Sequence, residues 1–161
     1  MMNKTLKTVL ILGGLMLVGT YGARKLLVPR GIRNNNPGNI KHFESNSWHG
    51  KTGVDPDGFV IFGDAADGID AIGEIIDSYR NRGVVTVSQI IETYAPAEGR
   101  DANDVESYIA HVQQLTGWQS YHMPTRFNGG YLPLVKAIIK HENGQNPYSD
   151  QFIEDALNRA T

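Results

Sequence analysis

Glu142 is the residue whose position most clearly suggests chemistry. It follows an apolar helical run over residues 134–139 and is followed at once by Asn143 and Gly144, which end helices. A carboxyl group presented at a rigid helix end, and partly desolvated by apolar neighbours, has a raised pKa and can act as a general acid near neutral pH. The alternative is a solvated Glu, whose charge at a helix C-terminus is unfavourable by roughly a few tenths of a kcal/mol.

Other kinds of site are not indicated. The chain has no cysteine and five histidines, none of which is spaced from another as zinc ligands on a helix or strand would be: His42, His49, His111, His122 and His141. Asp55 and Asp57 lie in a Gly/Pro turn that lacks the other acids of a calcium loop. Phosphate-binding loops, dinucleotide fingerprints and nucleophile elbows are also missing from the sequence, so we expect no metal and no cofactor.

The elements that must position Glu142 are mostly helices. Asp64 can cap a helix that ends at Gly83, Thr86 opens a short helix to Tyr94, and Asn103 opens one that ends at Gly117. Pro133 suits the first turn of the helix that leads to Glu142, and Ser149 caps a last one. Residues 58–62 read as a strand and residues 31–58 as loops. The prediction is a mainly α (α+β) body of five helices with a small β element.

Charge divides the 161-residue chain into two parts. Residues 1–33 hold six of the 15 basic residues and no acid, which leaves nine basic residues against 17 acidic ones in the remainder. An acidic body argues against a nucleic-acid partner, because phosphate binding needs a basic face. Its length allows one compact domain with a sizeable core.

The basic N-terminal part, residues 1–33, contains an apolar segment, and this segment predicts one transmembrane helix. Residues 8–23 carry no charge and would span about 24 Å as a helix, and residues up to Val28 could extend it toward a hydrocarbon core of about 30 Å. A cleaved signal peptide and a buried core helix are the alternatives. The sequence thus predicts a single-pass membrane protein of undetermined orientation, in a virion internal membrane or a bacterial inner membrane, with lipid contacts over residues 8–28.

Several strings resemble bacteriophage virion-associated proteins that contain a lysozyme-like domain. These strings are Arg30–Ile40, Trp48–Gly50, Gly58–Phe62, Tyr94–Pro96 and His141–Ser149. A weaker resemblance is to lytic transglycosylases, in which a helix ends in Glu-Ser-Gly-Phe-Asn-Pro with a catalytic Glu. Here the similar string is Glu142–Pro147, with Asn143 in place of Ser. Tyr94–Gly99 and Glu106–Ile109 are similar to two further motifs of that family, but they precede the Glu, so the implied relation is a circular permutation.

The apolar segment predicts a membrane anchor and connector over residues 1–29, and the resemblance implies a lysozyme-like muralytic domain over residues 30–161. Glu142 would be the catalytic acid and base, and peptidoglycan glycan strands the substrate. The residues implied to bind the sugar are Asn36, Asn39, Tyr94 and Tyr108. A hydrolytic enzyme would need a second carboxylate about 5–9 Å away, for which the candidates are Glu44, Asp55 and Asp57.

Three other functions are compatible with the same sequence. The chain could be a peptidoglycan endopeptidase, or a non-catalytic structural transmembrane virion protein whose lysozyme-like body binds cell wall or other virion proteins. It could also be a lysis accessory or an effector that does not degrade cell wall. The departures from the transglycosylase motifs at Ala95 and Asn143 favour the structural alternative.

Overall fold

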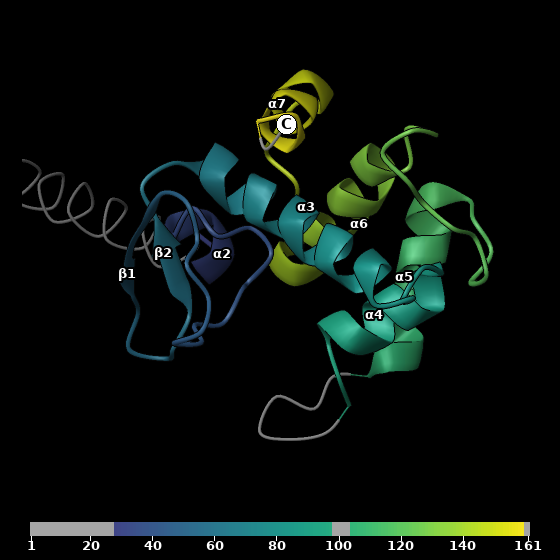
Figure 1. Cartoon of the computed structure of the whole chain (residues 1–161), viewed down its shortest axis with the longest axis horizontal. Coiled ribbons are helices and arrows are strands. Elements are labelled where there is room, and N and C mark those ends of the chain that lie inside the picture. The colour runs from purple at the N-terminus through teal and green to yellow at the C-terminus, as the bar shows by residue number, and fades with distance from the viewer. Residues whose placement is uncertain (1–27, 98–103, 160–161) are drawn as a thin grey trace, which may run out of the picture.

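The structure, a computed structural model, describes residues 28–97 and 104–159. Within this part the elements follow in the order α2 (Arg30–Arg33), β1 (Lys51–Val54), β2 (Val60–Phe62), α3 (Ala65–Asn81), α4 (Val87–Tyr94), α5 (Val105–Thr116), α6 (Tyr131–Asn143) and α7 (Asp150–Leu157). The body is therefore helical, with one small sheet beside it (Figure 1).

The longest described helix, α3, lies at the centre. The Asp64 side chain accepts a hydrogen bond from the Ala66 backbone N–H at 2.7 Å and so caps its first turn. One face of α3 is buried and packs against α6, α7 and strand β2. Figure 1 shows the sheet and α2 near one end of α3 and α4 and α5 near the other. Helix α3 therefore connects the region of the sheet and α2 with the region of α4 and α5.

Helix boundaries agree with the sequence where a local capping signal exists. Thr86 and Gln89 form the expected capping box, Ser149 caps α7, and Gly117 ends α5 in the left-handed conformation at φ 74°. The prediction that Asn103 caps α5 is wrong, because Asp104 is the N-cap and accepts from the Ser107 backbone N–H at 3.0 Å. Residue 103 itself lies outside the described residues.

The region 31–58, expected to be loops throughout, contains two regular elements. One is the single helical turn of α2, and the other is β1, which pairs antiparallel with β2. The pairing is interrupted between Lys51 and Gly53, where the register shifts. A four-residue strand with this irregularity and alternating partly exposed residues has no apolar pattern, which is why the sequence did not reveal it.

The hydrophobic core lies between the helices. Its largest fully buried side chains are Tyr108, Phe62, Ile69, Ile72, Ile76, Ile90, Ile91, Leu134, Ile138, Ile139, Ile153 and Val60. The apolar stripes expected on α3, α4 and α6 supply most of them. Burial of these stripes fixes the end of α6, and with it Glu142, against the rest of the body.

The predicted transmembrane helix and single-pass membrane localisation are corrected by the structure. Across residues 28–97 and 104–159, every helix is too short or too polar to cross a membrane. The segment for which the membrane helix was predicted, residues 8–28, lies outside the described residues except for Val28. The longest described helix has 17 residues and carries several charges, whereas a spanning helix needs about 20 mostly apolar ones.

Candidate active site

The asparagine-rich loop over residues 34–40 is held in shape by Asn36. This side chain is completely buried, and its Nδ2 donates to the backbone oxygens of Ile40 at 2.9 Å and Val60 at 2.8 Å. Its Oδ1 accepts from the Ile40 N–H at 2.9 Å. The sequence placed Asn36 against a sugar, but the structure turns all of its polar atoms inward, where they close the loop and join it to β2.

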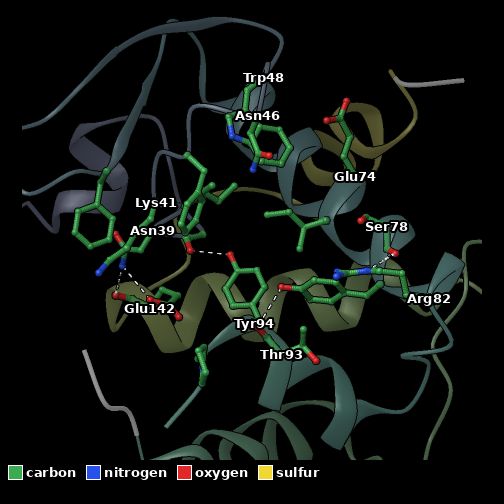
Figure 2. Close-up of a pocket in the computed structure, with 18 of the residues that line it drawn as sticks. Asn39, Lys41, Asn46, Trp48, Glu74, Ser78, Arg82, Thr93, Tyr94 and Glu142 are labelled. Carbon is green, nitrogen blue, oxygen red and sulfur yellow. Dashed lines mark hydrogen bonds between the residues drawn. The ribbon is translucent and has the colours of Figure 1, made fainter. Parts of the chain in front are cut away.

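Asn39 joins the same loop to the acid. Its Nδ2 donates to Glu142 Oε2 at 3.0 Å and to the Glu142 backbone oxygen at 3.2 Å (Figure 2). The backbone of Asn39 is left-handed at φ 49°, a conformation that asparagine tolerates better than most residues. The structure therefore brings together two of the predicted site residues, across 103 positions of sequence.

Asn143 completes the connection between the loop and the end of α6. Its side chain is buried, and its Nδ2 donates to Pro37 O at 2.7 Å and to Ile139 O at 2.9 Å. The next residue, Gly144, ends the helix in the left-handed conformation at φ 68°. Asn143, a departure from the transglycosylase motif, thus has a clear structural role beside Glu142.

Glu142 lies in an environment that disfavours its ionised form. Burial raises the pKa of its carboxyl group above the usual value of 4.5. The hydrogen bond from Asn39, the nearby Tyr108 hydroxyl and the positive charge of Arg30 lower this pKa, but they do not cancel the effect of burial. A carboxyl group of this kind can hold a proton closer to neutral pH than an ordinary Glu.

Tyr108 lies behind Glu142 rather than on a surface. It is completely buried, and its ring stacks on the His141 ring with centroids 3.5 Å apart and an interplanar angle of 5°. The Nδ1 atoms of His111 and His141 lie 3.0 Å apart. Tyr108, implied by the resemblance to bind the sugar, therefore has no exposed surface in the structure, although its hydroxyl group lowers the pKa of Glu142.

Tyr94 is anchored against the loop. Its hydroxyl group donates to the Gly38 backbone oxygen at 2.7 Å. Gly38 is in close contact with α3 and α4, since a Cβ there would overlap this hydroxyl group and lie 2.8 Å from Cγ1 of Ile72. Tyr94 therefore lines the site while it fixes the loop.

These residues border one large cleft of about 1010 Å³, the upper end of the usual range for ligand sites. Figure 2 shows Glu142 and Asn39 at one side, Tyr94 in the middle, and the side chains from α3 at the other. We call Arg30, Asn39, Phe59 and Glu142 the acid end, and Glu74, Ser78 and Arg82 the α3 end. The loop residues Asn46 and Trp48 also line the cleft.

The expected second carboxylates do not reach this cleft. Asp57 pairs with Arg30 at 3.2 Å, and Asp55 accepts from Asn34 Nδ2 at 2.8 Å. Glu44, with a side chain 98% exposed, pairs with His42. Glu74 does line the cleft, and its sequence position gives no sign of this because one Glu on an amphipathic helix is usually solvated. Figure 2 places it across the cleft from Glu142.

Among residues 28–97 and 104–159, no group of three or more His, Asp or Glu side chains is arranged to hold a metal ion. The polar groups at the acid end are instead amides, hydroxyls and one guanidinium around a single carboxyl group. Such a set can donate a proton, accept one back and orient a neutral ligand.

Comparison with known proteins identifies a relative. No protein-family model matches the chain. The chain is 36% identical over 125 residues to "Protein P5" of Pseudoalteromonas phage PM2, and the match covers 74% of each protein. This match confirms the bacteriophage part of the sequence-based prediction, whereas the lysozyme-like and lytic transglycosylase parts remain predictions. The chain therefore belongs to the family of the bacteriophage Protein P5.

Proposed function

We propose that this protein cleaves the glycan strands of peptidoglycan, with Glu142 as both acid and base. The observation that carries the proposal is a single carboxyl group, buried enough to have a raised pKa, at the edge of a cleft of about 1010 Å³. A cleft of this size has room for more than one sugar ring. The resemblance of Glu142–Pro147 to the helix end of lytic transglycosylases points to the same chemistry.

In the proposed reaction, protonated Glu142 gives its proton to the glycosidic oxygen between N-acetylmuramic acid and N-acetylglucosamine. The bond from this oxygen to C1 of the muramic sugar breaks. The carboxylate then takes the proton of the muramic C6 hydroxyl group as its oxygen bonds to C1 and closes an anhydro ring. Glu142 ends the cycle protonated, so no water is consumed.

The surroundings of Glu142 favour this route over hydrolysis. A hydrolytic glycosidase uses a second carboxylate about 5–9 Å from the first. In the described part of the chain, the carboxyl group that shares the cleft is Glu74, which lies across it at the α3 end. Asn39 holds the Glu142 carboxyl group through Oε2, which keeps its orientation fixed while it exchanges a proton.

Aromatic and amide groups support a sugar ligand. The side chains of Phe43, Trp48, Phe59 and Tyr94 line the cleft, and aromatic rings pack well against the apolar faces of sugars. Asn46 and Asn39 offer amide groups beside them. Because the relative is a bacteriophage protein, we also propose that the chain acts in the virion, alongside other virion proteins.

The test is a turbidity assay on purified sacculi with the full chain, followed by mass analysis of the products. We expect clearing and anhydro-muropeptides, and a loss of roughly 10²–10⁴-fold in rate for Glu142→Gln, since this is the usual contribution of a general acid. The matched control is Glu92→Gln, at an exposed position of α4 that does not line the cleft. A cooperative thermal unfolding transition shows that the Glu142→Gln variant is folded.

Each other outcome contradicts the proposal in a different way. Clearing that survives Glu142→Gln removes this residue from the mechanism. Reducing sugar ends in place of anhydro ends identify a hydrolase, and cut peptide cross-links identify an endopeptidase. No clearing by the folded wild type supports the structural, non-catalytic alternative.

A further inference from the structure

Three rings from α5 and α6 lie behind Glu142, outside the cleft. Tyr108 and His111 are three residues apart, so they share one face of α5, and His141 directly precedes Glu142 on α6. The two helices pack against each other, and Tyr108, His111 and His141 do not line the cleft. A ligand in the cleft is therefore not in contact with these rings, and any influence they have on the acid passes through the protein.

The Tyr108 hydroxyl group is the part of this cluster that acts on the acid. It is buried and makes no regular hydrogen bond in the described part of the chain, yet it lies close enough to the Glu142 carboxyl group to lower the pKa of that group. A buried hydroxyl group gains from a bond that it can only form to a correctly placed acceptor. Because this hydroxyl group does not anchor its own ring, the position of the ring depends on the groups packed against it.

His141 covers one face of the Tyr108 ring. The two ring centroids are 3.5 Å apart and the planes differ by 5°, so the imidazole lies flat against the phenol ring. Tyr108 is completely buried, which means that its ring has no free space to move into while this stack is present. Removal of the imidazole would open a gap beside the ring and allow the hydroxyl group to leave Glu142.

His111 fixes the orientation of His141 in turn. The Nδ1 atoms of the two imidazoles lie 3.0 Å apart, a distance that requires a hydrogen between them, so one Nδ1 donates and the other accepts. The rings are tilted by 50° to each other, and the contact is made at the ring edges. His141 is therefore held at its edge by His111 and at its face by Tyr108.

The charge state of the pair is compatible with this contact. Burial and the nearby His111 lower the pKa of His141, so its imidazole is neutral near neutral pH and can share a single hydrogen with its partner. On the elements that pack against α5 and α6, charged and titratable groups act on other partners: Lys136 and Asp150 on each other, Lys140 on Gly144 O, Asp77 and Arg126 on each other, Tyr94 on Tyr108, and Arg30 on Glu142.

We propose that His141 is a positioning residue for the acid: together with His111, it holds the Tyr108 ring where the hydroxyl group acts on Glu142. Neither histidine touches the ligand or exchanges a proton with it. The inference rests on the proposed function in one respect, because Glu142 is the acid of that reaction. It adds that the readiness of Glu142 to give up its proton is set from behind the cleft, by a pair of imidazoles, as well as by Asn39 within it.

The first experiment measures the pKa of Glu142 in the full chain from the NMR signal of its carboxyl group, which is identified by its loss in Glu142→Gln. His141→Ala and Tyr108→Phe should each raise this pKa, because in both variants the hydroxyl group no longer acts on the carboxylate. In the Tyr108→Phe background, His141→Ala should have no further effect, since His141 acts through Tyr108. An unchanged pKa in His141→Ala, or a rise that persists in the double variant, overturns the inference.

Two further variants separate positioning from packing in general. His122→Ala is the matched control, because His122 also stacks on an aromatic ring, that of Trp118 with centroids 4.2 Å apart, but does not line the cleft or contact the cluster. It should leave the pKa of Glu142 unchanged. His141→Phe keeps a flat ring against Tyr108 and should bring this pKa back toward the wild-type value, and failure to do so overturns the role of the stack.

His111→Ala keeps the test decisive if His141→Ala does not show a cooperative unfolding transition. His111 is only partly buried, so its loss should leave the fold intact while it frees the edge of His141. The pKa of Glu142 should rise in this variant as well. An unchanged pKa in a folded His111→Ala protein overturns the inference.

The second experiment follows the same variants in the clearing of purified sacculi and separates this inference from the proposed function. His141→Ala should lower the rate about tenfold and move the alkaline limb of the pH–rate profile to higher pH, whereas His122→Ala should change neither. If the wild type clears no sacculi but the NMR pattern holds, the proposed function fails and the positioning of Glu142 stands. If clearing depends on Glu142 but its pKa is the same in all of the histidine variants, the proposed function stands and the positioning role fails.

Discussion

The two ends of the cleft are built in opposite ways. At the acid end, the side-chain NH₂ groups of Asn36, Asn39 and Asn143 all donate to groups within the protein, while the Oδ1 atoms of Asn39 and Asn143 are buried without a hydrogen-bond partner. At the α3 end, Glu74 and the outer edge of Arg82 have no such bonds in the described part of the chain. The carboxyl group at the acid end is thus oriented by a hydrogen bond from the protein, whereas the carboxyl group at the α3 end is not.

This difference indicates that the acid end holds a side chain in a fixed orientation and that the α3 end is suited to recognising a ligand. A group that must exchange a proton with a reacting bond benefits from a fixed position, and buried hydrogen bonds supply it. A group that only selects a ligand can remain exposed, because the ligand itself completes its bonding. Substitutions at the acid end should therefore affect stability and chemistry together, and those at the α3 end should affect recognition alone.

The largest effect is expected at Asn36. Asn36→Ala removes three buried hydrogen bonds, including the one that the Ile40 backbone N–H donates to Asn36 Oδ1, so we expect a loss of about 3 kcal/mol in the free energy of unfolding. Ser78→Ala, its counterpart at the α3 end, should change this free energy by less than about 0.5 kcal/mol because Ser78 is exposed. Urea unfolding measures both. Similar losses at the two positions would remove the contrast between the ends.

Gly38→Ala should come next. The added methyl group would overlap the Tyr94 hydroxyl group and crowd Ile72, which we expect to cost about 2 kcal/mol. The matched control is Gly53→Ala in β1, where the new methyl group would lie 3.8 Å from Ile61 Cδ1, an ordinary contact. Thermal unfolding of the two variants gives the comparison. A Gly38→Ala protein as stable as the control would show that the loop is not held tightly against α4.

Asn39→Gly tests whether the loop tunes the acid. In the wild type, the hydrogen bond from Asn39 to Oε2 lowers the pKa of Glu142. Glycine keeps the left-handed backbone but cannot form this bond. The pKa of Glu142 should rise, so the alkaline limb of the pH–rate profile should move to higher pH, while the maximal rate falls about tenfold through lost orientation. Asn35→Gly is the control, since Asn35 has the same backbone conformation and binds Phe62 and Gly63 instead. Equal shifts in both variants would exclude tuning by Asn39.

The smallest effect concerns the stability of Glu142→Gln. Because burial raises the pKa of Glu142 in the folded protein above its unfolded value near 4.5, ionisation costs stability as the pH rises through the folded pKa. The variant should thus unfold at a higher temperature than the wild type at pH 8, and the difference should vanish below about pH 4. Glu92→Gln on the exposed face of α4 should show no such trend. A gap that is independent of pH would contradict a raised pKa.

Local signals made the helices predictable and left the irregular elements hidden. Thr86 and Ser149 act on backbone groups within three residues of themselves, so their caps can be read from the sequence. Strand β1 depends on pairing with β2 across a turn, and nothing in its own residues requires it. The two amides of the motif at 36 and 39 look alike in sequence, yet one is buried and the other bonds the acid.

The sequence predicted the site residue that lies at a helix end. It did not predict the positions of site residues that depend on how the helices pack together. Glu142 follows from the apolar run and the helix stop, and the structure places it in the cleft. The inward position of Tyr108 depends on α5 packing against α6. Whether Glu74 lines the cleft depends on which face of α3 is turned toward it. Both are consequences of the assembled body, which no local pattern encodes.

The contact between Asn39 and Glu142 joins positions 103 residues apart, and this separation has a consequence for biosynthesis. As the chain emerges from the ribosome, the amide is made early and the carboxyl group late, after most of the described body. Until α6 has been translated and has folded against the loop, the nascent protein has Asn39 but not the Glu142 carboxyl group to which it donates. The contact between the two side chains can therefore form only when synthesis is nearly over, and under the proposed function a chain that stops before α6 would be inactive.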